Sequence, residues 1–263
     1  MKIVVCIKQV PDTAEVKLDP KTGTLIRDGV PSIINHDDKA GLEAALQLRE
    51  KVGGTVTVVC MGPPQADVAL REALAMGADD AYLLSAREFG GSDTYATATI
   101  IATGLRKIGF DLVITGRQAI DGDTAQVGPQ IAEKLGIPQV SYAADIQKEG
   151  ETLTIKRMLE DGYMTIKVKT PCLLTCIKEL NEPRYMSVSG VFEAYSKPLT
   201  TFDYEALKDD PLIDKSTIGL SGSPTNILTS FTPPQKGAGM MLEGADKAAC
   251  EKLAEILAKK HII

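Results

Sequence analysis

Tryptophan is absent from this chain of 263 residues, histidine occurs twice, and aromatic residues make up only 5% of it. The two histidines, His36 and His261, lie far apart, so sites that depend on histidine, such as Ser-His-Asp triads and many zinc centres, have little material. The 29 lysine and arginine residues are outnumbered by 35 acidic ones, which leaves no basic excess for a phosphate backbone. We expect no histidine-based catalysis, no metal site and no nucleic-acid partner.

Long apolar runs are also missing, and none approaches the roughly 20 residues that a membrane-spanning helix needs. The N-terminal MKIVVCIKQV reaches Lys8 after five apolar residues, which is typical of a strand and not of a signal peptide. The five cysteines are irregularly spaced, so a disulfide framework is not expected. Cys172 and Cys176 are interpreted as buried core residues on one face of a strand. We expect a cytoplasmic protein with no membrane insertion.

The first 143 residues alternate short β-branched runs with longer amphipathic stretches, and this pattern predicts βα units around a doubly wound parallel sheet. Pro64 before the second helix, Gly77 and Gly136 after helices, and Asp93 or Ser92 before another helix are suitable helix-end residues. The expected strands are 2–7, 55–60, 81–84, 112–115 and 139–143, and the expected helices are 37–52, 65–76, 94–108 and 125–135.

The pattern changes after residue 144, where LTIKRM, MTIKVK and TPCLLTCI predict an alternating antiparallel extension of the sheet. The turn at Asp161-Gly162 suits an antiparallel hairpin. Prolines and small polar residues predict a long irregular arm over 195–244, and 245–263 predicts an amphipathic helix that rests on its own core or on a partner chain. We therefore expect a nucleotide-binding α/β domain in 1–195, and an arm with a C-terminal helix in 196–263.

The predicted ligand site lies beyond the C-terminal ends of the parallel strands, where the strand order reverses. Three loops belong there, 8–12, 61–64 and 115–130. In the third, Gly116 and Gly122 allow close backbone approach, and residues 124–127 offer free N–H groups and the Thr124 hydroxyl at a helix N-terminus. This loop predicts a phosphate site.

A plain turn remains an alternative interpretation, because Asp-Gly-Asp-Thr is typical of many turns into a helix. Asp121 and Asp123 suit capping, turn closure or sugar hydroxyls, whereas Arg117 suits charge pairing. The segment 35–38 has a helix cap as its alternative to a ligand role, and Lys8 is either a ligand contact or a solvated strand end. The sequence contains no GxxxxGK[ST] motif and no GxGxxG after the first strand.

The segment GRQAIDGDTAQVGPQIAEKLGIPQVSYA resembles the nucleotide-binding signature of the beta (small) subunit of electron-transferring flavoproteins. The segments IKQVPDT, INHDDKAGLEAAL, CMGPPQADVALREALAMGADDAYLL and LNEPRYMSVSGVFEA resemble the same family in the same order, so the resemblance covers nearly the whole chain. It implies a fold of the adenine-nucleotide α-hydrolase-like type. It also implies a heterodimer with a larger alpha subunit, whose FAD exchanges electrons with acyl-CoA dehydrogenases and related partners.

The resemblance carries site residues onto this sequence. His36 departs from the family, which usually has proline there, and the contact of that turn is correspondingly less defined. Val188 takes the place of the apolar anchor with which the family docks its dehydrogenases, or else is a half-buried helix residue. The implied nucleotide contacts are Cys6, Asn35, His36, Asp37, Asp38, Met61, Thr94, Gly116, Arg117, Gln118, Ala119, Ile120, Asp121, Gly122, Asp123, Thr124, Ala125, Gln126 and Val127.

The family has one branch that holds AMP as a structural filler and another that holds a second FAD and bifurcates electrons from NADH. The loop VPDTAEVKLDPKTGTLIRDGV, the helix start SDTYATAT and the turn DGDTAQVGP, with its Gly122, resemble the bifurcating branch. The resemblance therefore implies FAD, NADH as donor, and two acceptors. These are the alpha-subunit FAD, which leads towards an acyl-CoA dehydrogenase, and a low-potential carrier such as ferredoxin or flavodoxin.

Two alternatives stay open at this point. In the first, the chain is the housekeeping beta subunit with structural AMP and no second flavin. In the second, it is an ATP-binding hydrolase on the same sheet, although such enzymes need a Ser/Gly-rich phosphate loop where this chain has QVPD. Under the leading interpretation the chain oxidises NADH only as a heterodimer, and the cofactor supplies the redox chemistry.

Overall fold

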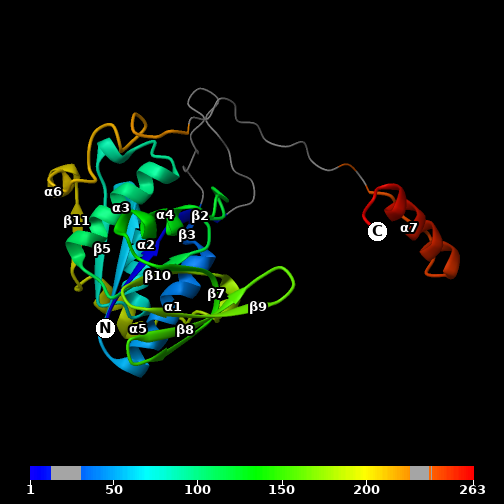
Figure 1. Ribbon diagram of the computed structural model, residues 1–263, viewed down its shortest axis with the longest axis horizontal. Helices are drawn as coiled ribbons and strands as arrows, with labels where there is room; N and C mark the ends of the chain where they lie inside the picture. Colours follow the sequence, from blue (N-terminus) through cyan, green and yellow to red (C-terminus); the bar gives the residue numbers. More distant parts are fainter. Residues whose placement is uncertain (13–30, 226–236, 238) are drawn as a thin grey trace. The chain divides into compact units, whose positions relative to one another are not determined.

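A computed structural model describes residues 1–12, 31–225, 237 and 239–263 (Figure 1). The chain divides into two compact units, Met1–Ile227 and Leu228–Ile263. The strands are β1 (Lys2–Ile7), β2 (Gln9–Pro11), β3 (Ser32–Ile34), β4 (Thr55–Met61), β5 (Asp80–Leu84), β6 (Leu112–Gly116), β7 (Gln139–Glu149), β8 (Thr152–Met158), β9 (Tyr163–Lys169), β10 (Cys172–Cys176) and β11 (Leu199–Phe202). The helices are α1 (His36–Val52), α2 (Asp67–Met76), α3 (Thr94–Ile108), α4 (Val127–Leu135), α5 (Val188–Ala194), α6 (Tyr204–Leu207) and α7 (Lys247–Lys259), with 3₁₀ turns η1 (Pro64–Ala66), η2 (Arg87–Phe89) and η3 (Lys178–Leu180).

The first unit is built on a nine-stranded sheet with the order β11-β5-β4-β1-β6-β10-β7-β8-β9. The strands from β11 to β7 run parallel, and β8 and β9 continue the sheet antiparallel. A separate antiparallel pair, β2 with β3, lies just after β1 in the sequence. The predicted α/β class, a parallel sheet with an antiparallel extension, is confirmed.

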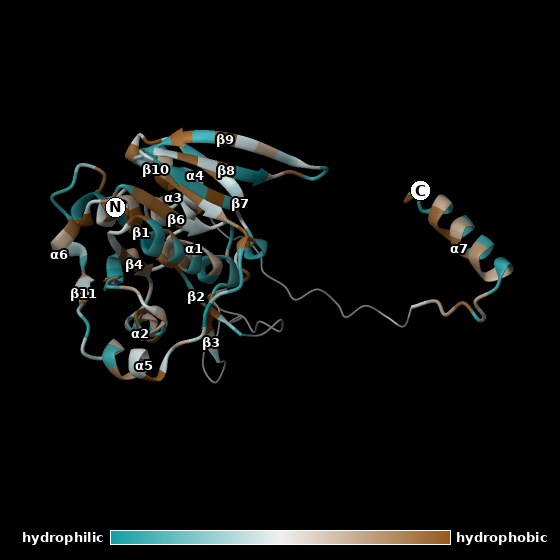
Figure 2. Ribbon diagram, turned by 90° about the horizontal axis from the view of Figure 1, so that it is seen from below, coloured by the Kyte–Doolittle hydropathy of each residue, from teal (hydrophilic) through white to brown (hydrophobic). Residues whose placement is uncertain are grey.

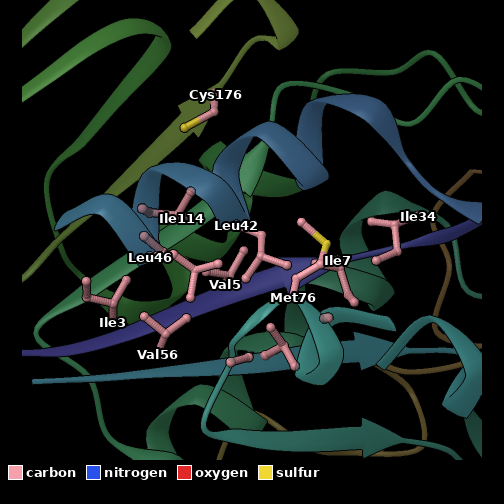
Figure 3. Packing of buried hydrophobic residues seen from close by; sticks show 14 of the residues in the cluster. Ile3, Val5, Ile7, Ile34, Leu42, Leu46, Val56, Met76, Ile114 and Cys176 are labelled. Atoms are coloured by element: carbon pink, nitrogen blue, oxygen red, sulfur yellow. The ribbon is translucent and has the colours of Figure 1, made fainter. Parts of the chain in front are cut away.

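Side chains of the central strand β1 are buried on both faces of the sheet. Ile3, Val5 and Ile7 belong to one apolar cluster with residues of α1 and α2, and Figure 3 shows them beside Leu42 and Leu46 of α1. The intervening residues of β1 belong to a second cluster with residues of α3 and α4. Helices therefore cover both faces, which is why the central strands read as nearly continuous apolar runs.

Strand β10 corrects the predicted topology. The segment TPCLLTCI was expected to continue the antiparallel extension, but β10 inserts between β6 and β7 and is parallel to both. All five of its residues are buried, as a central parallel strand requires. The burial of Cys172 and Cys176 in the core is confirmed, and all five cysteines of the chain are free thiols.

Most predicted helix and strand positions are confirmed within a residue or two. The expected helix 125–135 begins later, at Val127. The hairpin predicted at Asp161-Gly162 joins β8 to β9. Residues beyond 195 add an edge strand to the main sheet, because β11 pairs with β5, so part of the predicted irregular arm belongs to the first unit.

The second unit contains α7, the helix predicted from its amphipathic pattern. The Asp246 carboxylate caps it by accepting a hydrogen bond from the N–H of Ala249, at 2.9 Å. Figure 2 shows hydrophobic and hydrophilic positions alternating along this helix, and Leu253 on its apolar stripe is exposed. Among the described residues, no helix is long and apolar enough to cross a membrane.

Candidate functional site

The strand order reverses between β1 and β6. From β1 the chain passes through α1 to β4 on one side, and it later returns through α3 to β6 on the other side of β1. In an open parallel sheet, the crevice beyond the C-terminal ends of such a strand pair is the usual ligand site. Lys8 follows β1 there, and residues 117–126, which we call the β6–α4 loop, follow β6.

The β6–α4 loop presents unpaired backbone donors at the start of α4. Asp123 and Ala125 have positive φ angles of 51° and 53°, and the N–H groups of Gly122 and Asp123 both bond the carbonyl of Ala119. Within the described part of the chain, the N–H groups of residues 124–127 have no hydrogen-bond partner. Free N–H groups at a helix N-terminus are suitable donors to an anion.

Thr124 is not the cap of α4, because the capping position is Gln126, whose side chain makes no capping bond. The Thr124 side chain is exposed. Gly122 has no need of a left-handed backbone, and a Cβ there would meet only the Lys8 amine at 4.0 Å. Thr124 is therefore accessible from outside, and Gly122 has open space on the side of Lys8.

Asn35 attaches the β6–α4 loop to the start of α1. It lies at the capping position, yet its side chain makes no capping bond. Instead its amide donates to the carbonyl of Gln118 at 2.8 Å, and its carbonyl oxygen accepts from the N–H of Ile120 at 3.1 Å. Asn35 is fully buried, so both interactions are protected from water. Its side chain supports the loop from behind.

The next two buried carboxylates hold three strand ends. Asp38 accepts hydrogen bonds from the N–H groups of Lys8 and Gly116, both at 2.8 Å, and thereby bridges β1 and β6. Asp37 accepts from the N–H of Lys178, which follows β10, at 3.0 Å. A Cβ on Gly116 would collide with the Asp38 carboxylate. Because Gly116 has no side chain, the Asp38 carboxylate can approach its backbone, and this role of Gly116 is separate from any contact with a ligand.

Burial raises the pKa of Asp38 to about 7, although its hydrogen bonds with Lys8, Gly116 and Asn35 act in the opposite direction. Burial, and then the charge of Asp38, also raises the pKa of the Cys6 thiol. Burial, and then the charges of Asp37 and Asp38, likewise raise the pKa of the Cys176 thiol. These thiols are held in the neutral form, which is inert as a nucleophile.

Lys8 and Arg117, which the described residues bring to the site, already have acidic partners. The Lys8 amine lies 2.6 Å from Asp121, and the Arg117 guanidinium lies 3.4 Å from Asp37. The second pair is poorly aligned, since neither Asp37 Oδ2 nor Arg117 Nε forms a hydrogen bond within the described residues. The Arg117 side chain is 34% exposed, so its guanidinium keeps donor capacity for a ligand, whereas Lys8 neutralises Asp121.

The remaining predicted contacts lie around the same crevice. Thr94, at the start of α3, donates to the side-chain carbonyl of Gln126 at 2.9 Å, while Gln118 bonds Asp123. His36 is exposed in the first position of α1. Met61 helps to line a small cleft of about 50 Å³ together with Lys8, Gln9, Cys60, Gly62, Pro63 and Ala66.

The donor set suits a phosphate or diphosphate group, because it combines free N–H groups, the Thr124 hydroxyl and Arg117. The cleft is much smaller than the ~300–1,000 Å³ of typical ligand pockets. A nucleotide bound here would therefore lie largely on the surface of the part of the chain that the structure describes. Among the described residues, no group of three or more His, Cys, Asp or Glu side chains is arranged to hold a metal ion.

A second surface feature is the segment 181–195, which we call the docking segment. Val188 opens α5 and is 78% exposed, so its interpretation as a half-buried helix residue is wrong. Phe192 and Tyr195 are 78% and 76% exposed, and Tyr185 is also exposed. Several exposed large apolar side chains within one short segment of a folded protein are typical of an interaction surface.

Arg184 attaches the docking segment to α1. Its guanidinium bonds both oxygens of the buried Glu43 at 2.8 and 3.0 Å, and its backbone N–H bonds the same carboxylate at 3.1 Å. It also pairs with Glu50 at 2.6 Å. The Asn181 amide donates to the carbonyl of Ala40 at 3.1 Å. One helix thus supports both the β6–α4 loop and the docking segment.

Comparison with known proteins agrees with this architecture. Residues 22–207 match the electron transfer flavoprotein domain. The chain is 59% identical to the acryloyl-CoA reductase electron transfer subunit gamma of Anaerotignum propionicum, and 56% identical to the electron transfer flavoprotein subunit beta of Clostridium acetobutylicum. It is 54% identical to the caffeyl-CoA reductase-Etf complex subunit CarD of Acetobacterium woodii, and each of these alignments covers 100% of both chains.

The chain belongs to the electron transfer flavoprotein family. Within that family it is a beta-type subunit that functions in electron transfer.

Sequence reasoning missed several residues that build the site. Gly128 lets α4 approach Thr115 and Thr175, where a Cβ would lie 2.7 Å from each side chain. Lys8 was considered as a ligand contact or a solvated strand end, but its pairing with Asp121 of the loop was not predicted. Glu43 and Arg184 were not singled out either. The sequence shows Gly128-Pro129 at the start of α4 and the charges of Glu43 and Arg184. It does not show which residues these groups contact in the fold.

Proposed function

We propose that this chain binds FAD in the crevice between β1 and β6 and works with an alpha subunit in electron bifurcation from NADH. One electron path leads to the alpha-subunit FAD and on to an acyl-CoA dehydrogenase, and the other leads to ferredoxin or flavodoxin. The observation that carries the site assignment is the row of free N–H groups at 124–127. Support for bifurcation comes from the resemblance of the helix start SDTYATAT and the turn DGDTAQVGP to that branch, and from relatives named as subunits of reductase complexes.

The protein contributes binding and orientation, whereas FAD, when bound, supplies the redox chemistry. The free N–H groups and the Thr124 hydroxyl would hold the diphosphate, and Arg117 would add a charged donor. Asn35 and Asp38 would keep this loop in place from behind. The loop 10–30, which also resembles the bifurcating branch, lies mostly outside the described residues.

Counting flavins in the purified heterodimer, and identifying the released nucleotide by mass, tests this proposal. Two flavins per heterodimer are expected, one of them on this chain. One flavin together with AMP would contradict it and would favour the housekeeping beta subunit. ATP hydrolysis by the chain would favour the hydrolase interpretation.

Thr124→Val is expected to weaken FAD binding about tenfold to a hundredfold, because it removes one hydrogen bond to a charged group worth roughly 1.5–3 kcal/mol. Gly122→Val is expected to leave a folded heterodimer that lacks this chain's flavin, since its side chain fills the crevice. Thr124 is not a cap, so the free energy of unfolding without nucleotide should stay within about 0.5 kcal/mol of the wild-type value. Flavin content and melting temperature are measured together on both variants.

Gly162→Val is the matched control, because Gly162 also has open space around it and lies in the β8–β9 turn. This control should retain its flavin. Full flavin occupancy in Gly122→Val would contradict the site assignment.

The alpha subunit is proposed to cover the nucleotide and to receive α7. Deleting residues 245–263 is expected to weaken heterodimer formation at least tenfold, while the sheet unit keeps its unfolding transition, because α7 belongs to a compact unit separate from the sheet unit. Sedimentation of the mixed subunits and thermal unfolding measure the two effects. Loss of the unfolding transition, with normal association of the fraction that stays folded, would show that α7 belongs to the core.

A further inference from the structure

We infer that Asp38 is the positioning residue of the nucleotide site, because its carboxylate ties the last residue of β6 to the residue after β1. The inference rests on the proposed nucleotide site. Both carboxylate oxygens are used, one by Gly116 N–H and the other by Lys8 N–H, each at 2.8 Å. The β6–α4 loop begins immediately after this bridge.

The close fit of Asp38 makes its ionisation matter. An ionised carboxylate accepts from both N–H groups, whereas a protonated one turns one oxygen into a donor that faces an N–H. The bridge then loses one of its two bonds, and the spacing of Lys8 and Gly116 relaxes. Gly116 leads directly into the β6–α4 loop, which carries the free N–H groups. When Gly116 shifts, these N–H groups therefore lose their alignment with the nucleotide.

The surroundings decide in which pH range this happens. The titratable and charged groups near Asp38 are Asp37 on the same helix, Cys6 on β1, Cys176 on β10, and the ion pairs Lys8–Asp121 and Arg117–Asp37. Burial is the largest cause of the shift and raises the pKa of Asp38 to about 7. Asp38 therefore changes its charge in the physiological range, where the neighbouring thiols stay protonated.

The sign of the stability effect follows from the same shift. Asp38 ionises near 3.8 in an unfolded chain and near 7 in the folded one, so its contribution to stability is present below pH 3.8 and is lost as the pH rises to about 7. Nucleotide affinity is expected to change in the opposite sense, because the ionised form aligns the loop. Binding near pH 7 should release a proton.

The test uses the full heterodimer with nucleotide removed from this chain, titrated with FAD. FAD is preferred to AMP because a phosphate monoester itself titrates near pH 6. Wild-type affinity should rise about tenfold between pH 6 and pH 8, and calorimetry in two buffers of different ionisation enthalpy should detect proton release near pH 7. Asp38→Asn should bind about tenfold more weakly at pH 8, with a flat pH profile and no proton release.

Asp79→Asn is the matched control, because the Asp79 carboxylate also accepts a backbone N–H, from Val56 at the opposite end of β4, at 2.8 Å. This variant should keep the wild-type pH profile. If Asp38→Asn does not fold, the wild-type profile and proton release still decide the matter. FAD binding that is independent of pH and releases no proton would overturn this inference alone, whereas absence of FAD binding at every pH would overturn the proposed function and this inference with it.

Discussion

Arg184→Ala is expected to lower the free energy of unfolding by about 3 kcal/mol, because it leaves the buried Glu43 carboxylate without its charged partner. The Glu43 side chain is only 5% exposed, and Arg184 supplies three of its hydrogen bonds. The backbone N–H of residue 184 survives the substitution, but the bidentate guanidinium contact does not. Chemical denaturation of the wild-type and variant chains measures the difference.

Glu50→Gln separates the buried half of this cluster from its surface half. Glu50 is 51% exposed and bonds the same guanidinium, so its neutralisation should cost no more than about 1 kcal/mol. Equal losses for Arg184→Ala and Glu50→Gln would contradict the assignment of the stability to Glu43. Arg184→Lys should recover only part of the loss, because an ammonium group cannot reproduce the fork-shaped contact.

The same cluster gives a pH dependence of known sign. Burial alone would raise the pKa of Glu43, but hydrogen bonds from Arg184 and Gln47 outweigh it and place the pKa below its ordinary value of 4.5. This contribution to stability is present above pH 4.5 and is lost as the pH falls through the lower folded-state value. In Arg184→Ala, the part of the stability loss at acidic pH that comes from Glu43 should disappear.

Val188→Asp is expected to reduce electron transfer to the proposed partner, an acyl-CoA dehydrogenase, about thirtyfold, through a rise in the KM for that partner. The substitution places an unpaired charge in a proposed apolar contact, which costs on the order of 2 kcal/mol at the interface. Val188 is 78% exposed in this chain, so the fold should tolerate the change. Flavin content and NADH oxidation with an artificial dye should stay at the wild-type level.

Val68→Asp provides the matched control, since Val68 is another exposed valine on a helix. It lies at the start of α2, whereas α5 approaches α2 near its other end, at Ala75. This control should transfer electrons normally. Unchanged transfer in Val188→Asp would remove Val188 from the docking surface, and a simultaneous loss of flavin would show that the variant acts on the fold instead.

Local sequence patterns were sufficient for most of the fold. Alternating βα segments predicted the parallel strands β1, β4, β5, β6 and β7, the Asp161-Gly162 turn predicted the hairpin, and the amphipathic repeat predicted α7, because each signal is carried by residues close together in the chain. The loop that follows β6 was also identified from sequence, since strand ends and helix starts follow from these same patterns. The start of α4 was predicted two residues too early, because the positive φ angles at Asp123 and Ala125 are not helical and the helix begins only at Val127.

Tertiary structure alone decided which distant segments meet. The apolar run of β10 is compatible with either an edge or a centre of the sheet, and only parallel pairing with both β6 and β7 places it in the core. Asp38 reaches Gly116 across 78 positions of sequence, and Glu43 reaches Arg184 across 141. Periodicity and turn chemistry describe neighbours along the chain, whereas these carboxylates are assigned their roles by backbone N–H groups and a guanidinium that only the folded topology brings to them.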